Sequence, residues 1–176
     1  AGSTEIRADT TRIVKDSLTE FAGNVEIIRD ARSISGDVVT YDDTNSLFEV
    51  NGHATIWNAG LTWQGEHALF DIESDVGRLN DGNYWLNQGR GHGYAETIEA
   101  DRKANISLLQ GVDYTTCLSS NPDWKFSAKK IRLDHDGGRG SATHAFPKVR
   151  GVPILYLPYL NFPLNNKRKS GFLIPT

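Results

Sequence analysis

Residues 38–42 read Val-Val-Thr-Tyr-Asp, and this short segment decides the fold because four similar segments recur along the chain. The similar segments end at Asp9, Asp71, Asp101 and Asp134, so the five aspartates are 33, 29, 30 and 33 residues apart. Self-similarity at a fixed period indicates an array in which one supersecondary unit is repeated. The sequence therefore predicts about five stacked units.

Each of the five segments is predicted to be a strand with one buried face. The side chains one and three places before each Asp are apolar, whereas those two and four places before it are mostly polar or charged. Alternate side chains of a strand point to opposite faces of a sheet. The closing Asp can accept a hydrogen bond from the backbone two residues further on, which favours a turn at that point.

Four glycines follow the same period, because Gly23, Gly52, Gly82 and Gly111 are 29, 30 and 29 residues apart. Glycine adopts positive φ at no steric cost, so we interpret these residues as tight connections between the two strands of each repeat. Apolar alternation resumes after the first three glycines and fails after the fourth, where Asp113 takes an apolar position. Helical periodicity is missing, so we expect an all-β chain, an elongated antiparallel sandwich or folded-over sheet of about ten strands.

Composition and charge limit the function classes. The 176 residues, 38% of them hydrophobic, suffice for one core without disulfides or metals. Residues 1–120 hold 9 Lys and Arg against 19 Asp and Glu, whereas residues 121–176 hold 10 against 3. The basic end indicates either an anionic partner or a solvated face, and the acidic part argues against nucleic acid as a partner.

The missing Met and the apolar last residues suggest a fragment of a longer, processed protein.

The two ends of the predicted array differ. The N-terminal strand at residues 5–9 is short and charged, which either protects the sheet edge or leaves it for a partner strand. Residues 152–164 are apolar and carry prolines at 153, 158 and 163, so they are predicted to form an edge or covering segment. Lys167, Arg168 and Lys169 follow, which fits a membrane interface or an ordinary linker beside a core segment.

Signatures of catalysis are scarce. The five histidines form no close ligand pair, and Gly89–Gly93 is best interpreted as an exposed hairpin turn. Cys117 is the only cysteine and lies in a polar, turn-like stretch, which favours an exposed thiol over a buried one. In an extracytoplasmic chain, such a thiol would pair with a cysteine outside this sequence.

Three pieces of the sequence resemble one known family: residues 21–27 of the repeat, the cysteine-bearing segment 114–117, and the junction at 151–160 with 168–175. They are similar to the OstA-type N-terminal periplasmic domain of lipopolysaccharide assembly proteins of the LptD type, over residues 5–176. The resemblance implies a V-shaped β-jelly roll at residues 1–150 and a Pro-rich apolar junction at 151–176 that leads to an outer-membrane β-barrel. It implies lipopolysaccharide transport, with no enzymatic chemistry and no cofactor.

The resemblance also implies a binding site. The inward-facing residues would form an apolar groove that shields the acyl chains of lipid A, although a closed core would have the same pattern. The expected lining is Val25, Ile27, Val39, Tyr41, Ala54, Ile56, Ala68, Phe70, Tyr84, Leu86, Ile98, Ala100, Ile131 and Leu133.

The partners implied by the resemblance lie at both ends of the domain. The N-terminal edge strand would receive the last strand of an LptA-type bridge protein. Cys117 would form an interdomain disulfide with the protein's own C-terminal barrel, which holds an LptE plug. The location would be the periplasmic side of the Gram-negative outer membrane.

Two other functions remain open from the residues. A lectin-like β-sandwich would bind glycans through exposed tryptophans, for which the candidates are Trp57, Trp63, Trp85 and Trp124. An enzyme on the same scaffold would need a pair of carboxylates in a cleft, and the sequence singles out no such pair.

Overall fold

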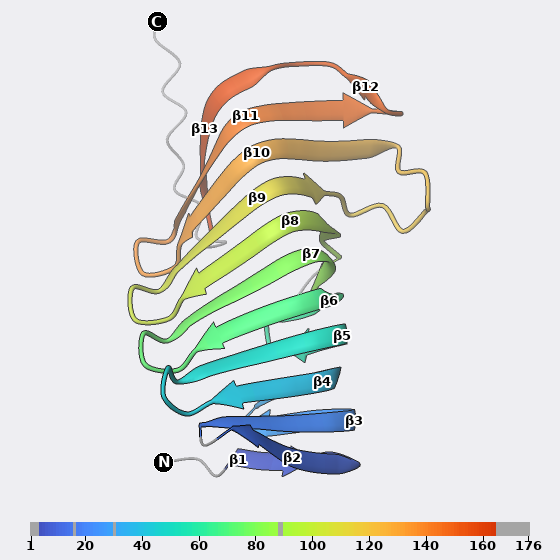
Figure 1. Cartoon of the computed structure of the whole chain (residues 1–176). Helices are drawn as coiled ribbons and strands as arrows, with labels where there is room; N and C mark the ends of the chain where they lie inside the picture. The colour runs from blue at the N-terminus through green and yellow to red at the C-terminus, as the bar shows by residue number, and fades with distance from the viewer. Residues whose placement is uncertain (1–3, 16, 30, 88–89, 165–176) are drawn as a thin grey trace, which may run out of the picture.

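The structure is a computed structural model that describes residues 4–15, 17–29, 31–87 and 90–164, and it is built from antiparallel strands (Figure 1). The all-β prediction is confirmed. The strands are β1 (Thr4–Arg7), β2 (Thr10–Lys15), β3 (Leu18–Arg29), β4 (Arg32–Asp42), β5 (Leu47–Trp57), β6 (Leu61–Asp71), β7 (Val76–Leu86), β8 (His92–Asp101), β9 (Ile106–Tyr114), β10 (Trp124–Asp134), β11 (Arg139–Val149), β12 (Val152–Pro153) and β13 (Leu157–Pro163).

All thirteen strands belong to one sheet. The long strands β3 to β11 pair in chain order, each with the next. At the N-terminal end both β1 and β2 pair with β3, and at the C-terminal end both β12 and β13 pair with β11. The strands are therefore stacked along one long axis, with a sheet edge at each end (Figure 1).

The sheet is folded over, because each long strand contributes to two layers. On β3, residues 18–22 pair with residues 38–42 of β4, whereas residues 25–29 pair with residues 32–36. The register shifts between the two halves, and it shifts in the same way between β4 and β5 and between β5 and β6. We call the half that contains residues 18–22 and 38–42 layer A, and the half that contains residues 25–29 and 32–36 layer B.

Residues with positive φ lie where the odd-numbered strands bend between the layers. We call this set the fold line: Asn24 on β3, His53 on β5, Asp81 on β7, Gly111 on β9 and His144 on β11, with φ of 45°, 44°, 51°, 56° and 49°. An extra residue in one strand of an antiparallel pair bends that strand and increases its twist. Such a bulge occurs on β3 and β5, and the positive-φ residues of β7, β9 and β11 continue the same line, along which the sheet folds.

The prediction that the repeat glycines are turns between strands is wrong. Gly23 and Gly52 have φ of 77° and 74°, as a tight connection would require, but they lie within β3 and β5. Gly82 and Gly111 likewise lie within β7 and β9. Positive φ at Gly23, Gly52 and Gly111 bends a strand without ending it, whereas on β7 the positive φ is at Asp81, next to Gly82.

The predicted aspartate turns are confirmed for four of the five segments, whose strands end at Asp42, Asp71, Asp101 and Asp134. Asp71 Oδ1 accepts hydrogen bonds from the backbone N–H groups of Glu73 and Ser74, at 2.9 and 3.0 Å. These turns lie at the left of Figure 1, at the margin of layer A. Asp9 differs, because it lies between β1 and β2 and accepts a hydrogen bond from Asn24 Nδ2 at 2.9 Å.

The two layers share one hydrophobic core. Its largest fully buried side chain is Trp63 on β6, whose indole lies against Gly65 and Gly82. These two glycines are cross-strand partners, so neither strand has a side chain under the ring. The glycines of β6 and β7 thus make room for a large aromatic ring between the layers.

Substitution of Gly82 by Ala should lower the free energy of unfolding by about 2–3 kcal/mol, because overpacking a filled core costs that much. The new Cβ would overlap the indole nitrogen of Trp63 and lie 2.6 Å from the Gln64 carbonyl oxygen. Urea unfolding of both proteins measures the difference. Gly60→Ala is the control, because the nearest atom to its Cβ is 3.6 Å away, and unchanged stability of Gly82→Ala would contradict this account.

Candidate lipid-binding interior and sheet edges

Most of the residues predicted to line an apolar groove lie in the core between the layers. Each of these nine side chains is at most 9% exposed. They are Val25, Ile27, Val39, Ala54, Ile56, Ala68, Tyr84, Ile98 and Ile131. The structure therefore brings residues from seven different strands to one interior.

The other five predicted residues lie toward the margins of the layers. Phe70 and Leu133 are half-buried and pack against the core. Tyr41 and Ala100 are half-buried as well. Leu86 is 40% exposed, so the prediction that it belongs to the buried interior is wrong. It is the last residue of β7, where the strand gives way to a turn and the side chain meets solvent.

An unbroken apolar row crosses layer A from β3 to β13. Each residue is the direct cross-strand partner of the next, so all point to the same face. We call this set the apolar row: Phe21, Val39, Val50, Ala68, Leu79, Ile98, Leu109, Ile131, Ala142 and Leu160. At 4.7–4.9 Å between neighbouring strands, it extends for about 43 Å.

Six members of the apolar row were not among the predicted lining residues: Phe21, Val50, Leu79, Leu109, Ala142 and Leu160. A signal was present, because Val50 and Leu109 each lie two residues before a repeat glycine. The residues before the glycines were not assigned to a strand face, since the glycines were interpreted as turns. With Gly52 placed inside a strand, the alternation that includes Ala54 and Ile56 extends back to Val50.

The interior is filled by the chain's own side chains in this structure. Val39, Val50 and Ala68 have no exposed surface, and the ideal Cβ position of Gly36 in layer B would lie 2.5 Å from Val50 in layer A. Both layers contribute fully buried residues to one core, for example Val39 in layer A and Ala54 in layer B. A ligand would have to separate the layers in order to enter between them.

One tyrosine brings a polar group into the interior. The Tyr84 hydroxyl donates a hydrogen bond to the Asp113 carbonyl oxygen at 2.8 Å. Burial raises the pKa of Tyr84 far above its ordinary value, so the hydroxyl stays neutral at any physiological pH. The interior therefore carries a satisfied polar group and no charge at this position.

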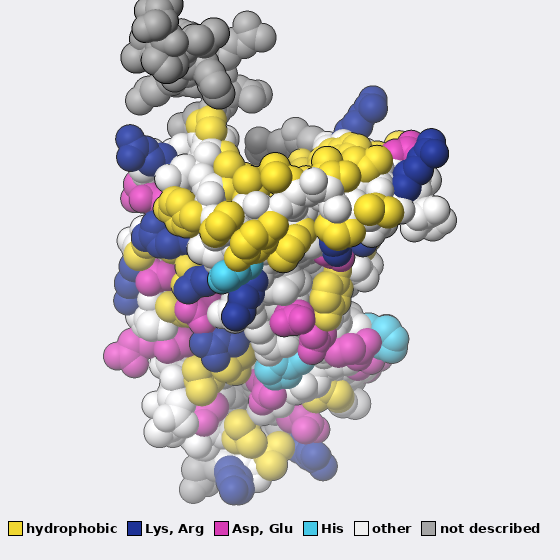
Figure 2. All heavy atoms as spheres, turned by 90° about the horizontal axis from the view of Figure 1, so that it is seen from above, with side chains coloured by type: hydrophobic (Ala, Val, Ile, Leu, Met, Phe, Trp, Pro, Cys, Tyr) yellow, Lys and Arg dark blue, Asp and Glu magenta, His cyan; other side chains and the backbone are white. Residues whose placement is uncertain are grey.

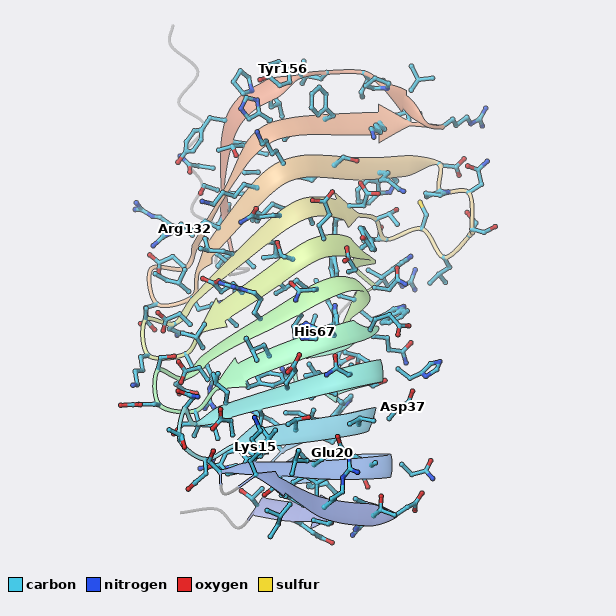
Figure 3. The ribbon with its side chains drawn as sticks, in the orientation of Figure 1. Lys15, Glu20, Asp37, His67, Arg132 and Tyr156 are labelled. Carbon is cyan, nitrogen blue, oxygen red and sulfur yellow. The ribbon has the colours of Figure 1, made fainter. Side chains whose placement is uncertain are left out.

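The outer face of layer A is charged, in contrast to the interior. Figure 3 shows Glu20, His67 and Arg132 along this face. Glu20 pairs with Arg12 at 3.1 Å, and His67 Nε2 lies 2.9 Å from Glu49 Oε1. Exposed pairs of this kind contribute little to stability. They do make this face hydrophilic, so it is a poor surface for acyl chains.

The C-terminal end of the sheet is apolar and exposed. Val152, Ile154 and Tyr159 are 62%, 63% and 59% exposed, and hydrophobic side chains form a broad band at this end in Figure 2. The predicted edge segment is confirmed, because β12 and β13 pair only with β11 and contain Pro153, Pro158 and Pro163. The basic residues Lys167, Arg168 and Lys169 lie outside the described residues.

One hollow lies on the outside of the molecule. It has a volume of about 500 Å³ and lies over β10, β11 and β13. Arg132, Arg139, Asp134 and Tyr159 are among the residues that line it. The hollow is therefore separate from the apolar interior.

Cys117 lies in the connection between β9 and β10 and is half-buried. Its backbone N–H donates to Thr115 Oγ1 at 3.1 Å, and its neighbour Leu118 is 84% exposed. Because the sequence has no second cysteine, the thiol has no partner within this chain.

The tryptophans predicted for a glycan-binding surface separate into two groups. Trp57, Trp85 and Trp124 are 46%, 39% and 38% exposed. Trp63 has no exposed surface, so its assignment to an exposed sugar-binding face is wrong. The apolar alternation on β6 places Trp63 inward, where Gly65 and Gly82 leave room for it.

Residues 5–139 match the family model described as "LptA/(LptD N-terminal domain) LPS transport protein". The chain belongs to this family. Its members are lipopolysaccharide transport components and not enzymes, which agrees with the resemblance found in the sequence. Family membership supports a role in lipopolysaccharide transport.

Relatives from several bacteria share this stretch of sequence. The chain is 37% identical to the LPS-assembly protein LptD of Cupriavidus necator over 98% of its length, and 34% identical to that of Acinetobacter baylyi over 97%. In both cases it spans 21% of the relative's length. The solved structure of LptH, the LptA homologous periplasmic component of the lipopolysaccharide transport device from Pseudomonas aeruginosa, covers 75% of this chain and 76% of its own, with a TM-score of 0.31 and 15% identity.

Among the described residues, no helix is long and apolar enough to cross a membrane. No group of three or more His, Cys, Asp or Glu side chains in that part of the chain is arranged to hold a metal ion.

The fold line should respond to pH through His53. His53 Nδ1 lies 2.7 Å from Asp37 Oδ2, and this hydrogen bond is the main cause that raises the pKa of His53 above its ordinary value of 6.5. The pair therefore stabilises the fold fully below pH 6.5, and this contribution disappears as the pH rises through the raised pKa. Thermal unfolding should show that Asp37→Asn destabilises the chain more below pH 6.5 than well above it.

A destabilisation by Asp37→Asn that is the same at every pH would contradict this role for the pair. Glu26→Gln is a suitable control, because Glu26 also carries a carboxylate near the bend and belongs to an ion pair with Arg7, at 3.6 Å, that has no histidine. Its effect should not vary in this pH range, since the Glu26–Arg7 pair contains no histidine.

Proposed function

We propose that the chain accepts lipopolysaccharide from a periplasmic bridge and shields the acyl chains of its lipid A between layers A and B, for delivery to the outer membrane. The observation that carries this proposal is the apolar row. It runs across the strands along the long axis of the array, which is the direction in which a lipid would move from one end of the domain to the other.

The energetics favour such a path. Each CH₂ group withdrawn from water contributes about 0.8 kcal/mol, so an acyl chain that left an apolar path would meet a large barrier. The row has an apolar side chain on every strand from β3 to β11 and on β13, so burial would be similar at each step. Its outer neighbours, such as Glu49 and Arg78, lie on the opposite face of the layer.

Lipid entry requires the two layers to separate, because the interior is filled. We place the hinge at the fold line, where the strands themselves connect the layers. At the opposite margin, layer A ends in the aspartate turns, and none of the described strands pairs across to layer B. Phe70 and the 44% exposed Ile72 lie at this margin, so apolar side chains would meet the acyl chains first.

The N-terminal edge is proposed to receive the bridge. Strands β1 and β2 pair only with β3, so their outer backbone groups are available to another strand. Ile6 and Ile13 are 39% and 76% exposed on these strands. A strand from an LptA-type protein would continue the sheet there by β-augmentation.

The C-terminal end is proposed to face the rest of a longer protein. The chain spans about a fifth of its relatives, and its exposed apolar surface at residues 152–159 suits burial against further protein. By resemblance, that remainder would be a β-barrel that holds an LptE plug, at the periplasmic side of the outer membrane. Residues 1–150 would then be the jelly roll and residues 151–176 the junction.

A photo-crosslinking amino acid tests the interior. At Phe70, which is half-buried at the margin of layer A, we expect capture of lipopolysaccharide in cells that express the longer protein. At Leu69, the adjacent residue on the opposite face, we expect no capture. The two positions share a strand and differ in face, so equal capture at both would overturn the proposal.

A second experiment tests the proposed disulfide of Cys117. In the longer protein, Cys117→Ser should change mobility on a non-reducing gel, because a bond between distant parts of the chain makes the denatured protein more compact. The reduced samples of both proteins should migrate together. If the substitution leaves the non-reduced mobility unchanged, Cys117 does not pair with the rest of the protein.

A further inference from the structure

The outer face of layer B differs in chemistry from the outer face of layer A. Trp57, Thr62, Trp85 and His92 are successive cross-strand partners on β5, β6, β7 and β8, so their side chains share one face. Their neighbours Ile56, Trp63 and Tyr84 are buried, which identifies this shared face as the outer one. The two tryptophans are 46% and 39% exposed.

A parallel row of polar side chains lies two residues closer to the fold line. Thr55, Gln64, Asn83 and Tyr94 are again successive cross-strand partners on the same four strands. Gln64 and Asn83 are exposed, and Tyr94 is 37% exposed. We call these two rows the aromatic strip: Trp57, Thr62, Trp85 and His92 with Thr55, Gln64, Asn83 and Tyr94. None of the eight residues is an acid, a lysine or an arginine.

This combination of side chains matches the chemistry of a saccharide. A sugar ring has an apolar C–H face, against which a flat aromatic ring can pack, and a rim of hydroxyl groups that donate and accept hydrogen bonds. Tryptophan and tyrosine provide the flat apolar surface together with a polar group. Amide and hydroxyl side chains such as Gln64, Asn83 and Thr55 both donate and accept. Trp57 on β5 and Trp85 on β7 both flank Thr62 on β6. Two strand spacings therefore separate the backbones of the two tryptophans, which is about 10 Å.

The aromatic strip also lies next to the proposed path of the lipid. Trp57 is the last residue of β5, and Trp85 precedes the last residue of β7, so both are at the margin of layer B. Leu86, which follows Trp85, is 40% exposed, so an apolar side chain lies beside the aromatic strip at this margin. A molecule with its acyl chains between the layers would bring its sugars out at this margin.

We propose that the aromatic strip binds the oligosaccharide of lipopolysaccharide while the acyl chains lie between the layers. The choice of this saccharide rests on the proposed function, because lipopolysaccharide is the glycan that the interior would deliver to this margin. The strip would hold the sugars against the outside of layer B, and the domain would contact both parts of its substrate.

The test measures binding of a saccharide that has no lipid. The probe is the oligosaccharide released from rough lipopolysaccharide by mild acid hydrolysis, and the readout is the dissociation constant from calorimetric titration of the chain. The double variant Trp57→Ala, Trp85→Ala should bind roughly ten-fold more weakly, because two aromatic contacts are lost. Trp124→Ala is the matched control, since Trp124 is 38% exposed but lies outside the aromatic strip, and it should bind as the unmodified chain does.

Folding and lipid capture are measured on the same proteins. Both surface variants should retain the thermal unfolding midpoint of the unmodified chain to within a few degrees, since exposed substitutions have small effects on stability. With a photo-crosslinker at Phe70 and lipid A as probe, the double variant should capture lipid as well as the unmodified chain, because lipid A lacks the oligosaccharide.

The outcomes separate the two proposals. If Phe70 captures lipid A but the double substitution leaves oligosaccharide affinity unchanged, the aromatic strip is not a saccharide site and the conduit stands. If Phe70 captures no lipid A, the conduit fails whatever the strip binds. Tighter binding of a chito-oligosaccharide than of the lipopolysaccharide oligosaccharide would overturn the assignment of the glycan.

Discussion

The structure depends on positive φ at one place in every second long strand. An L-residue other than Gly rarely adopts this conformation, and Asn, Asp and His are the side chains that tolerate it best. Every residue of the fold line on β3, β5, β7, β9 and β11 is a Gly, Asn, Asp or His. Without the bend, the same strands would form a flat sheet with an apolar face open to water. The bend turns that face on itself, and the apolar row and the closed interior both follow from it.

The sequence alone predicted the inward and outward faces of the strands in layer A. It did not predict the fold line. Apolar alternation before each Asp predicted the inward direction of Val39, Ala68 and Ile98, because alternation depends only on the local pleat. The repeat glycines were misinterpreted for a physical reason: positive φ is required both by a tight turn and by a bulge within a strand. Which one forms depends on whether the hydrogen-bonded ladder continues beyond the glycine. That is set by the neighbouring strands, where, for example, Asn51 pairs with His67, 16 positions further along the chain.

The sequence also did not predict which apolar side chains at the ends of strands are exposed to solvent. Leu86 follows the alternation of β7 but lies where that strand ends, so its face has no opposite layer to meet it. Trp63 shows the reverse case, because an aromatic ring that fits a surface role is buried once Gly65 and Gly82 are aligned beside it. Both outcomes depend on cross-strand register, which a single sequence does not display. The candidate interior could be predicted in outline, and its borders required the paired strands.

The free edge at β2 has a further consequence for any strand that joins it. Thr11 on β2 is the cross-strand partner of Phe21, the first residue of the apolar row. Because strand side chains alternate, a slip of one residue in a joining strand would exchange its apolar face for its polar one. A joining strand shifted by an even number of residues would keep its apolar side chains on the inner face, whereas a shift by an odd number would place its polar side chains there. Both arrangements could form the same number of backbone hydrogen bonds. Whether an apolar path continues across such a joint therefore depends on whether the shift of register is even or odd. Counting the hydrogen bonds between the two proteins would not distinguish these cases.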